Sequence, residues 1–255
     1  MEKPKIEVSI ILISAAIVFF LTVSYVYAAG DIEPTYAESI TTESSTRFPG
    51  QAEKSIEAEA GNVTELTIYS KRSTEAWQGY YGNITGTITL DDAQNNTMYD
   101  WQIADPEGEI YASNGSGVVW ADVACVDFTA AAGMNETTLE TFYGINETDL
   151  DGFSETFNET YSDALGFRVG GVTINDVDSC HMAYTFVDGS YQTTSFKEVL
   201  LTDSTSIIFT TLLESNVDGF KTGVDAHDFQ MLVAEDGHPG QEDTTTTYWF
   251  YVELS

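Results

Sequence analysis

The chain has 255 residues, and its 42% hydrophobic and 13% aromatic content is enough for a packed core, which excludes wholesale disorder. It carries 9 Lys+Arg against 41 Asp+Glu, a formal net charge of −32, which excludes a nucleic-acid partner because phosphate recognition requires a basic surface. Two cysteines are too few for a disulfide-dense scaffold or a Cys-rich zinc module.

The first thirty residues contain an apolar segment typical of membrane-spanning helices and signal peptides. Residues 1–7 form a short leader with Lys3 and Lys5, and residues 8–29 are mostly apolar and carry no charge. A run of about 20 such residues matches the hydrocarbon thickness of a bilayer, and the two lysines favour a cytoplasmic leader. We expect residues 8–29 to be a single-pass transmembrane anchor or a cleaved secretory signal in contact with the lipid bilayer. Either interpretation places the rest of the chain outside the cell.

Glu7, just before the apolar segment, leaves a pilin-like subunit open as an alternative. Such subunits combine a basic leader, an apolar helical tail and a β-rich head, and some have a glutamate near the start of the tail. The small residue expected before a prepilin-type cut is missing, because Pro4 and Lys5 precede Ile6. In this alternative the N-terminal helix packs in the core of a filament.

A spacer and a β-rich domain follow. Residues 30–61 are rich in Glu, Ser, Thr and Ala, which predicts an acidic, solvated spacer. Residues 62–255 repeatedly alternate apolar and polar side chains, as half-buried β-strands do. The expected strands are 66–68, 84–90, 99–103, 110–112, 118–120, 123–128, 167–174, 182–187, 196–201, 207–213, 229–233 and 244–254. The last of them is apolar on both faces, which predicts a central strand.

Residues typical of turns and helix caps complete the prediction of the fold. Residues 105–108 (DPEG) predict a turn that makes a hairpin of 99–103 and 110–112. Asn135 and Gly144 are suited to cap a helix between them, and a second short helix is expected within 149–161. We therefore predict an all-β fold, an antiparallel β-sandwich-like extracellular domain with one or two short helices, preceded by a single N-terminal apolar helix. Two packed β units with a boundary near 130–165 are also possible.

Two kinds of covalent modification are expected in an exported domain. Cys125 and Cys180 are the only thiols, and an even pair outside the cytosol most simply forms one disulfide. Asn-x-Ser/Thr sequons, which are candidate glycosylation sites, fall mostly at predicted turns and caps. They begin at Asn62, Asn83, Asn95, Asn114, Asn135, Asn146 and Asn158.

Candidate ligand sites are weak. Glu147, Asp149 and Asp151 precede Gly152 in a spacing like the start of a calcium loop, but the loop's twelfth position is Asn158 instead of a bidentate glutamate. No metal is therefore assigned, and a capped, solvated turn is the preferred interpretation. A sugar-stacking platform is possible for four aromatic residues, although such rings in β-domains more often pack in the core. These are Trp77, Tyr80, Tyr81 and Trp101.

Catalytic motifs are not found in the sequence. The only imidazoles belong to His181, His227 and His238, and neither a Gly-x-Ser-x-Gly elbow, a His-Glu-x-x-His helix nor a phosphate-binding glycine loop occurs. Acidic pairs are inevitable among 41 carboxylates, so they do not argue for glycosidase chemistry. We expect a protein that is not an enzyme and needs no cofactor.

Several segments together resemble a family of exported archaeal surface proteins. They are WQGYYGNITG at 77–86, MYDW at 98–101, GEIYA at 108–112, DFQMLV at 228–233 and YWFYVEL at 248–254, so the likeness covers roughly residues 62–255. The resemblance implies a surface location and no catalytic residue. The resulting hypothesis is an archaeal cell-surface glycoprotein, membrane-anchored or secreted, with a structural or adhesive role. The alternatives are a filament subunit that contacts copies of itself or other surface proteins, and a carbohydrate- or calcium-binding module.

Overall fold

The computed structural model describes residues 33–43, 48, 55–103, 106–215, 217–223, 226–236 and 245–254. The leader and the predicted anchor or signal at 8–29 lie outside these ranges, so the expected N-terminal helix is not described. Within them, no helix has the length and apolar character needed to cross a membrane.

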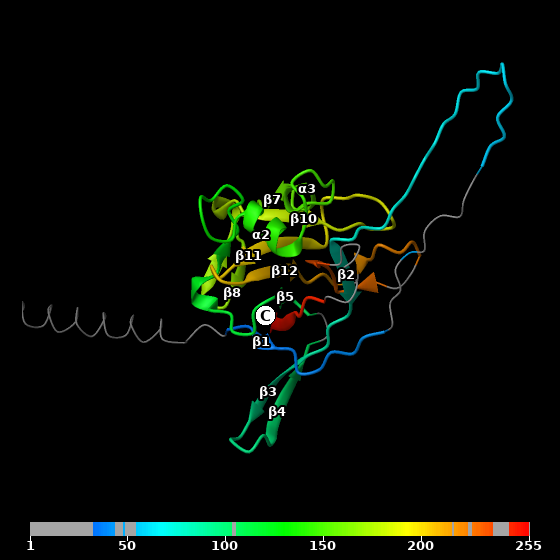
Figure 1. Cartoon of the computed structure of the whole chain (residues 1–255). Helices are drawn as coiled ribbons and strands as arrows, with labels where there is room; N and C mark the ends of the chain where they lie inside the picture. The colour runs from blue at the N-terminus through cyan, green and yellow to red at the C-terminus, as the bar shows by residue number, and fades with distance from the viewer. Residues whose placement is uncertain are drawn as a thin grey trace, which may run out of the picture.

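One eight-stranded antiparallel sheet forms the centre of the molecule (Figure 1). Along the sheet the strands are β1 (Thr35–Tyr36), β16 (Trp249–Leu254), β5 (Gly108–Ser113), β12 (Ile207–Leu212), β11 (Lys197–Thr202), β10 (His181–Tyr184) and β7 (Glu159–Thr160), and β6 (Ala124–Cys125) pairs with β11. Strands that precede residues 130–165 in the sequence and strands that follow them belong to this one sheet, although a boundary between two β units was considered there. The first strand lies within the predicted spacer, because Thr35 and Tyr36 pair with β16.

Smaller elements surround this sheet. The two-stranded sheets are β2 (Trp77–Gly82) with β15 (Phe229–Ala234), β3 (Thr87–Asp91) with β4 (Thr97–Gln102), β8 (Phe167–Val169) with β9 (Val172–Ile174), and β13 (Val217–Asp218) with β14 (Ala226–His227). The helices are α2 (Glu136–Tyr143) and α3 (Phe153–Thr156), and the 3-10 turns are η1 (Trp120–Asp122) and η2 (Asp176–Asp178). The described chain is therefore mostly antiparallel β with two short α-helices, as predicted.

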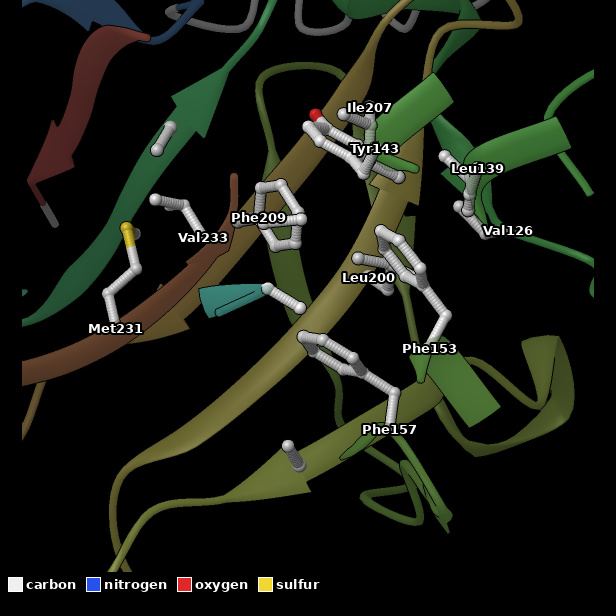
Figure 2. Packing of buried hydrophobic residues seen from close by; sticks show 14 of the residues in the cluster. Val126, Leu139, Tyr143, Phe153, Phe157, Leu200, Ile207, Phe209, Met231 and Val233 are labelled. Carbon is white, nitrogen blue, oxygen red and sulfur yellow. The ribbon is translucent and has the colours of Figure 1, made fainter. Parts of the chain in front are cut away.

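Both faces of the main sheet are covered, which makes the arrangement sandwich-like. Successive residues of a strand point to opposite faces, and on β5 Ile110 belongs to one core whereas Tyr111 belongs to the other. The first core is closed by β2, β15, α2 and α3, and Figure 2 shows Phe153, Phe157 and Phe209 packed together in it. The second core is closed by β8, β9 and the loop that carries Trp120.

The predicted disulfide between Cys125 and Cys180 is confirmed, with a Cα–Cα distance of 4.9 Å. Cys125 lies on β6 and Cys180 directly precedes β10. Both β6 and β10 pair with β11, while β12 occupies its other edge, so the sheet itself brings the two cysteines together. Cys180 is fully buried in the second core.

The helix predicted at 135–144 is confirmed as α2. The Asn135 side chain accepts a hydrogen bond from the backbone N–H of Thr138 (2.9 Å), and Gly144 ends the helix at a left-handed φ of 64°. The second helix, α3, is shorter than the predicted 149–161, because residues Glu159–Thr160 join the main sheet as β7.

The predictions for the pairing of β5 and for the burial of β16 need correction. The hairpin expected across 105–108 is wrong, because β4 pairs with β3 whereas β5 pairs with β12 and β16. Both edges of β5 are thus occupied by other strands. The closing strand, β16, is only half-buried apart from Tyr251 and has the two-residue β1 on its outer side, so it is not a central strand buried on both faces.

Two segments extend from the body of the molecule (Figure 1). The β3–β4 hairpin was expected to be half-buried, but all residues of both strands are exposed. Its base is fixed by the backbone N–H of Ile84, which donates to Asp228 (2.8 Å). The second segment, residues 55–72, is exposed throughout and contains no strand, which corrects the strand expected at 66–68. We call residues 55–72 the arm.

Candidate functional site

A pair of glutamates that the sequence analysis missed lies where β5 meets β16. Glu109 is directly opposite Glu253 in the sheet register and is only 8% exposed. The Glu253 carboxylate accepts hydrogen bonds from the Tyr111 hydroxyl (3.1 Å) and from the Gly170 backbone N–H (2.9 Å). Burial raises the pKa of Glu109 to about 8, and the charge of Glu253 adds to the rise. Glu109 therefore holds its proton at neutral pH.

A polar hollow of about 220 Å³ lies on the same side of the sheet. It is lined by Tyr161, Ser162, Asp163, Ala164, Met182, Tyr184 and Lys197. Burial, with the charges of Asp163 and Glu109, raises the pKa of Tyr161 to about 12, so its hydroxyl stays protonated and can donate. Hydroxyl and ammonium donors beside one carboxylate are suited to holding a small polar ligand.

Another buried carboxyl lies on the opposite face of the sheet. Glu198 of β11 is fully buried, and its Oε2 accepts a hydrogen bond from the backbone N–H of Leu232 (2.8 Å) on β15. Burial raises the pKa of Glu198 well above its ordinary value, and its Oε1 has no hydrogen-bond partner among the described residues. Beside it, the Thr211 hydroxyl donates to the Gln230 carbonyl (2.9 Å). Glu198 and Thr211 therefore attach β15 to the main sheet, which is a structural role.

The four predicted stacking aromatics do not form one platform. Trp77 packs edge-on against Phe153 with ring centroids 5.2 Å apart, and its indole N–H donates to the Asp151 carbonyl (2.7 Å). Tyr80 also packs against the first core. Trp101 is 50% exposed on the β3–β4 hairpin, so only Tyr81 remains on the surface of the β2–β15 sheet.

Tyr81 belongs to a surface cluster that the sequence analysis did not identify. Its ring lies 5.0 Å from Phe220 and 4.8 Å from the His227 ring, and the Lys221 ammonium lies 4.4 Å from its centroid. The Nε2 atom of His227 is buried without a hydrogen-bond partner in the described chain. Phe220, Lys221 and His227 are close in the sequence, but Tyr81 is placed beside them by the pairing of β2 with β15, so spacing in the sequence offers no signal for the cluster.

Two of the three residues considered for calcium, Asp149 and Asp151, accept hydrogen bonds from other protein groups. Asp149 accepts hydrogen bonds from the backbone and side chain of Asn146 (2.9 and 3.1 Å), and Asp151 accepts one from the Thr74 hydroxyl (2.5 Å). Glu147 is exposed. This arrangement fits the capped turn that was the preferred interpretation.

A different acidic group is formed by Glu136 and Glu140 of α2 and Glu155 of α3. One carboxylate oxygen from each lies within 4.8 Å of the others. Burial raises the pKa of Glu140, and the charges of Glu136 and Glu155 raise it further, while a hydrogen bond from the Phe153 backbone acts in the opposite direction. Packing of α2 against α3 brings the three residues together. This packing explains the acidic group without a bound metal ion.

The seven sequons differ in accessibility. Five asparagines are exposed, namely Asn62, Asn83, Asn95, Asn146 and Asn158. Asn114 is half-buried and accepts a hydrogen bond from the Ile207 backbone N–H (3.0 Å). Asn135 is also half-buried, and its Nδ2 donates to the Ala130 carbonyl (2.9 Å). The exposed five therefore offer the more accessible amide nitrogens.

The described chain defines a disulfide-linked, mostly antiparallel β protein with two short helices. Comparisons with models of protein families, with curated proteins and with solved structures find no match for this chain. The resemblance to exported archaeal surface proteins therefore stays a prediction.

Proposed function

We propose that this chain is an exported cell-surface protein with a structural or adhesive role. The observation that carries the proposal is the Cys125–Cys180 disulfide. Disulfides form and persist in oxidising environments outside the cytosol. Because Cys180 is fully buried in the second core, the bond is part of the folded structure and is not an exposed redox pair.

Two further observations support an extracellular position. The charge-free segment 8–29 is suited to membrane insertion or export. Five of the seven sequon asparagines are exposed, as glycan attachment requires. An archaeal source is part of the proposal through the resemblance of residues 62–255.

A carbohydrate- or calcium-binding module is supported less well. Trp77 and Tyr80 contribute to the core, which leaves Tyr81 and its neighbours as the remaining stacking surface on β2. Asp149 and Asp151 already accept hydrogen bonds from protein groups.

Surface labelling of intact cells tests the proposal. A membrane-impermeant reagent that acylates amines is expected to modify Lys71 as completely before cell lysis as after it, because Lys71 lies in the exposed arm. Modification at residue 71 should disappear in the Lys71→Arg variant, which keeps the charge but removes the amine. A cytosolic protein in the same cells serves as the control for lysis. Labelling that appears only after lysis would contradict the exported location.

A further inference from the structure

The β3–β4 hairpin has one entirely apolar face that the described chain leaves uncovered. The register places Ile88 opposite Trp101 and Leu90 opposite Tyr99, so these four side chains share one face. Their exposed fractions are between 50 and 59%. The other face carries Thr87, Thr89, Asp100 and Gln102.

Such a face requires a partner. An isolated two-stranded hairpin is marginally stable in water, and a contiguous exposed apolar patch marks an interaction surface. The Tyr99 and Trp101 rings already pack edge-on at 4.8 Å, which gives the face a rigid aromatic part. We call the face formed by Ile88, Leu90, Tyr99 and Trp101 the hairpin face.

The arm has matching features. Leu66 and Ile68 are 53 and 83% exposed, and residues two positions apart share one side of a chain when it adopts the strand conformation. The backbone of residues 62–73 forms no strand, although its sequence alternates as strands do. The arm thus has the sequence pattern of a β-strand but pairs with no strand of the described chain.

The last residues of the arm have charges opposite to those of the hairpin. The hairpin carries Asp91, Asp92 and Asp100 and no cation. The arm carries Glu57, Glu59 and Glu65 in its earlier part, but it ends in Lys71 and Arg72, the only adjacent pair of cations in the chain. A second hairpin on the hairpin face would bring only like charges together, whereas residues 66–72 of the arm bring two opposite ones.

We propose that the arm of one copy docks on the hairpin face of a second copy. Figure 1 shows that the arm and the β3–β4 hairpin of one chain extend in opposite directions from the body, so one chain does not join its own two segments. Leu66 and Ile68 pack on the apolar side chains of the hairpin, and Lys71 and Arg72 lie near its aspartates. Because the two surfaces differ, the contact is head-to-tail and repeats along an open chain of copies.

This inference rests on the structural role proposed above and names its partner, which is another copy of the chain. Cross-linking between copies in the purified full-length protein does not depend on the compartment. A negative cross-linking result would therefore not argue against the exported location. Labelling of Lys71 only after cell lysis would likewise not argue against the contact between copies.

Thiol trapping tests the contact. The Leu66→Cys and Tyr99→Cys variants are purified separately in mild detergent, mixed and oxidised gently, and the native disulfide is checked by mass after digestion. A docked pair holds the new thiols at a high effective concentration, so we expect about tenfold more 66–99 disulfide than for Leu165→Cys mixed with Tyr99→Cys. Leu165 is 89% exposed and lies outside both segments, which makes it a matched control.

The double variant L66C/Y99C separates the possible occupants. Docking between copies yields a ladder of covalent multimers on a non-reducing gel. A covalently closed monomer would mean that the arm folds back on its own chain, and a strong 99–99 dimer from Tyr99→Cys alone would mean hairpin-to-hairpin packing. Either result overturns the proposal, as does a 66–99 yield no higher than that of the control.

Discussion

Replacing Cys125 and Cys180 together with alanine is expected to lower the free energy of unfolding by about 4 kcal/mol. The disulfide closes a loop with a sequence separation of 55 residues. In the chain-entropy model, opening a loop of this size returns conformational freedom mainly to the unfolded chain. Urea unfolding followed by tryptophan fluorescence measures the loss as a lower midpoint.

Reduction of the wild-type protein is the matched control for this substitution. Dithiothreitol should move the wild-type midpoint to near that of the double-alanine variant, and should leave the variant unchanged. If the variant and the oxidised wild type unfold at the same urea concentration, the disulfide does not contribute to the fold as described.

The Glu109→Gln substitution is expected to remove a loss of stability that the wild type undergoes as the pH rises. The unfolded chain releases this proton near the ordinary value of 4.5, whereas burial and Glu253 hold the pKa in the native state at about 8. Between these values the native state binds more protons than the unfolded state. The contribution of Glu109 is therefore fully present below pH 4.5 and is lost as the pH rises to 8. Relative to the wild type, the variant should gain about 3 kcal/mol between pH 4.5 and pH 7.

Urea unfolding of both proteins at the two pH values measures this gain. The control is Glu107→Gln, which changes an exposed glutamate two residues earlier in the chain. We expect the gain of Glu109→Gln between the two pH values to exceed that of this control. A gain no larger than that of the control would show that Glu109 is not held protonated in the native state.

Much of the main sheet could be predicted because its strands combine apolar content with the two-residue period. The ranges 196–201 and 207–213 correspond closely to β11 and β12, which lie in the middle of the sheet and pair with each other. The caps of α2 could also be predicted, because Asn135 and Gly144 act locally through their own backbone and side chain.

Pairing between strands distant in the sequence could not be predicted from local signals. Residues 105–108 have the composition of a hairpin turn, but β12 and β16 occupy both edges of β5 and exclude β4. The alternation of apolar and polar residues in 84–90 correctly indicated an amphipathic strand, yet it could not indicate that the apolar face stays exposed.

The candidate site was missed for a related reason. Glu109 shares a face with Tyr111 because the two are two positions apart on one strand, and this alternation could have placed the glutamate toward the second core. Its position opposite Glu253, a residue far away in the sequence, depends on the register of the sheet. The register of the β2–β15 pairing likewise determines that Trp77 packs in the core and is not available for stacking with Tyr81.

The central claim is that the chain matures outside the cytosol, and intact-mass analysis of the native protein tests it most directly. The account predicts that reduction adds the hydrogens of one disulfide, and that the mass exceeds that of the polypeptide by glycans on exposed asparagines such as Asn83 or Asn146. Recovery of an unmodified polypeptide with both thiols already reduced, from the soluble interior of the cell, would contradict it.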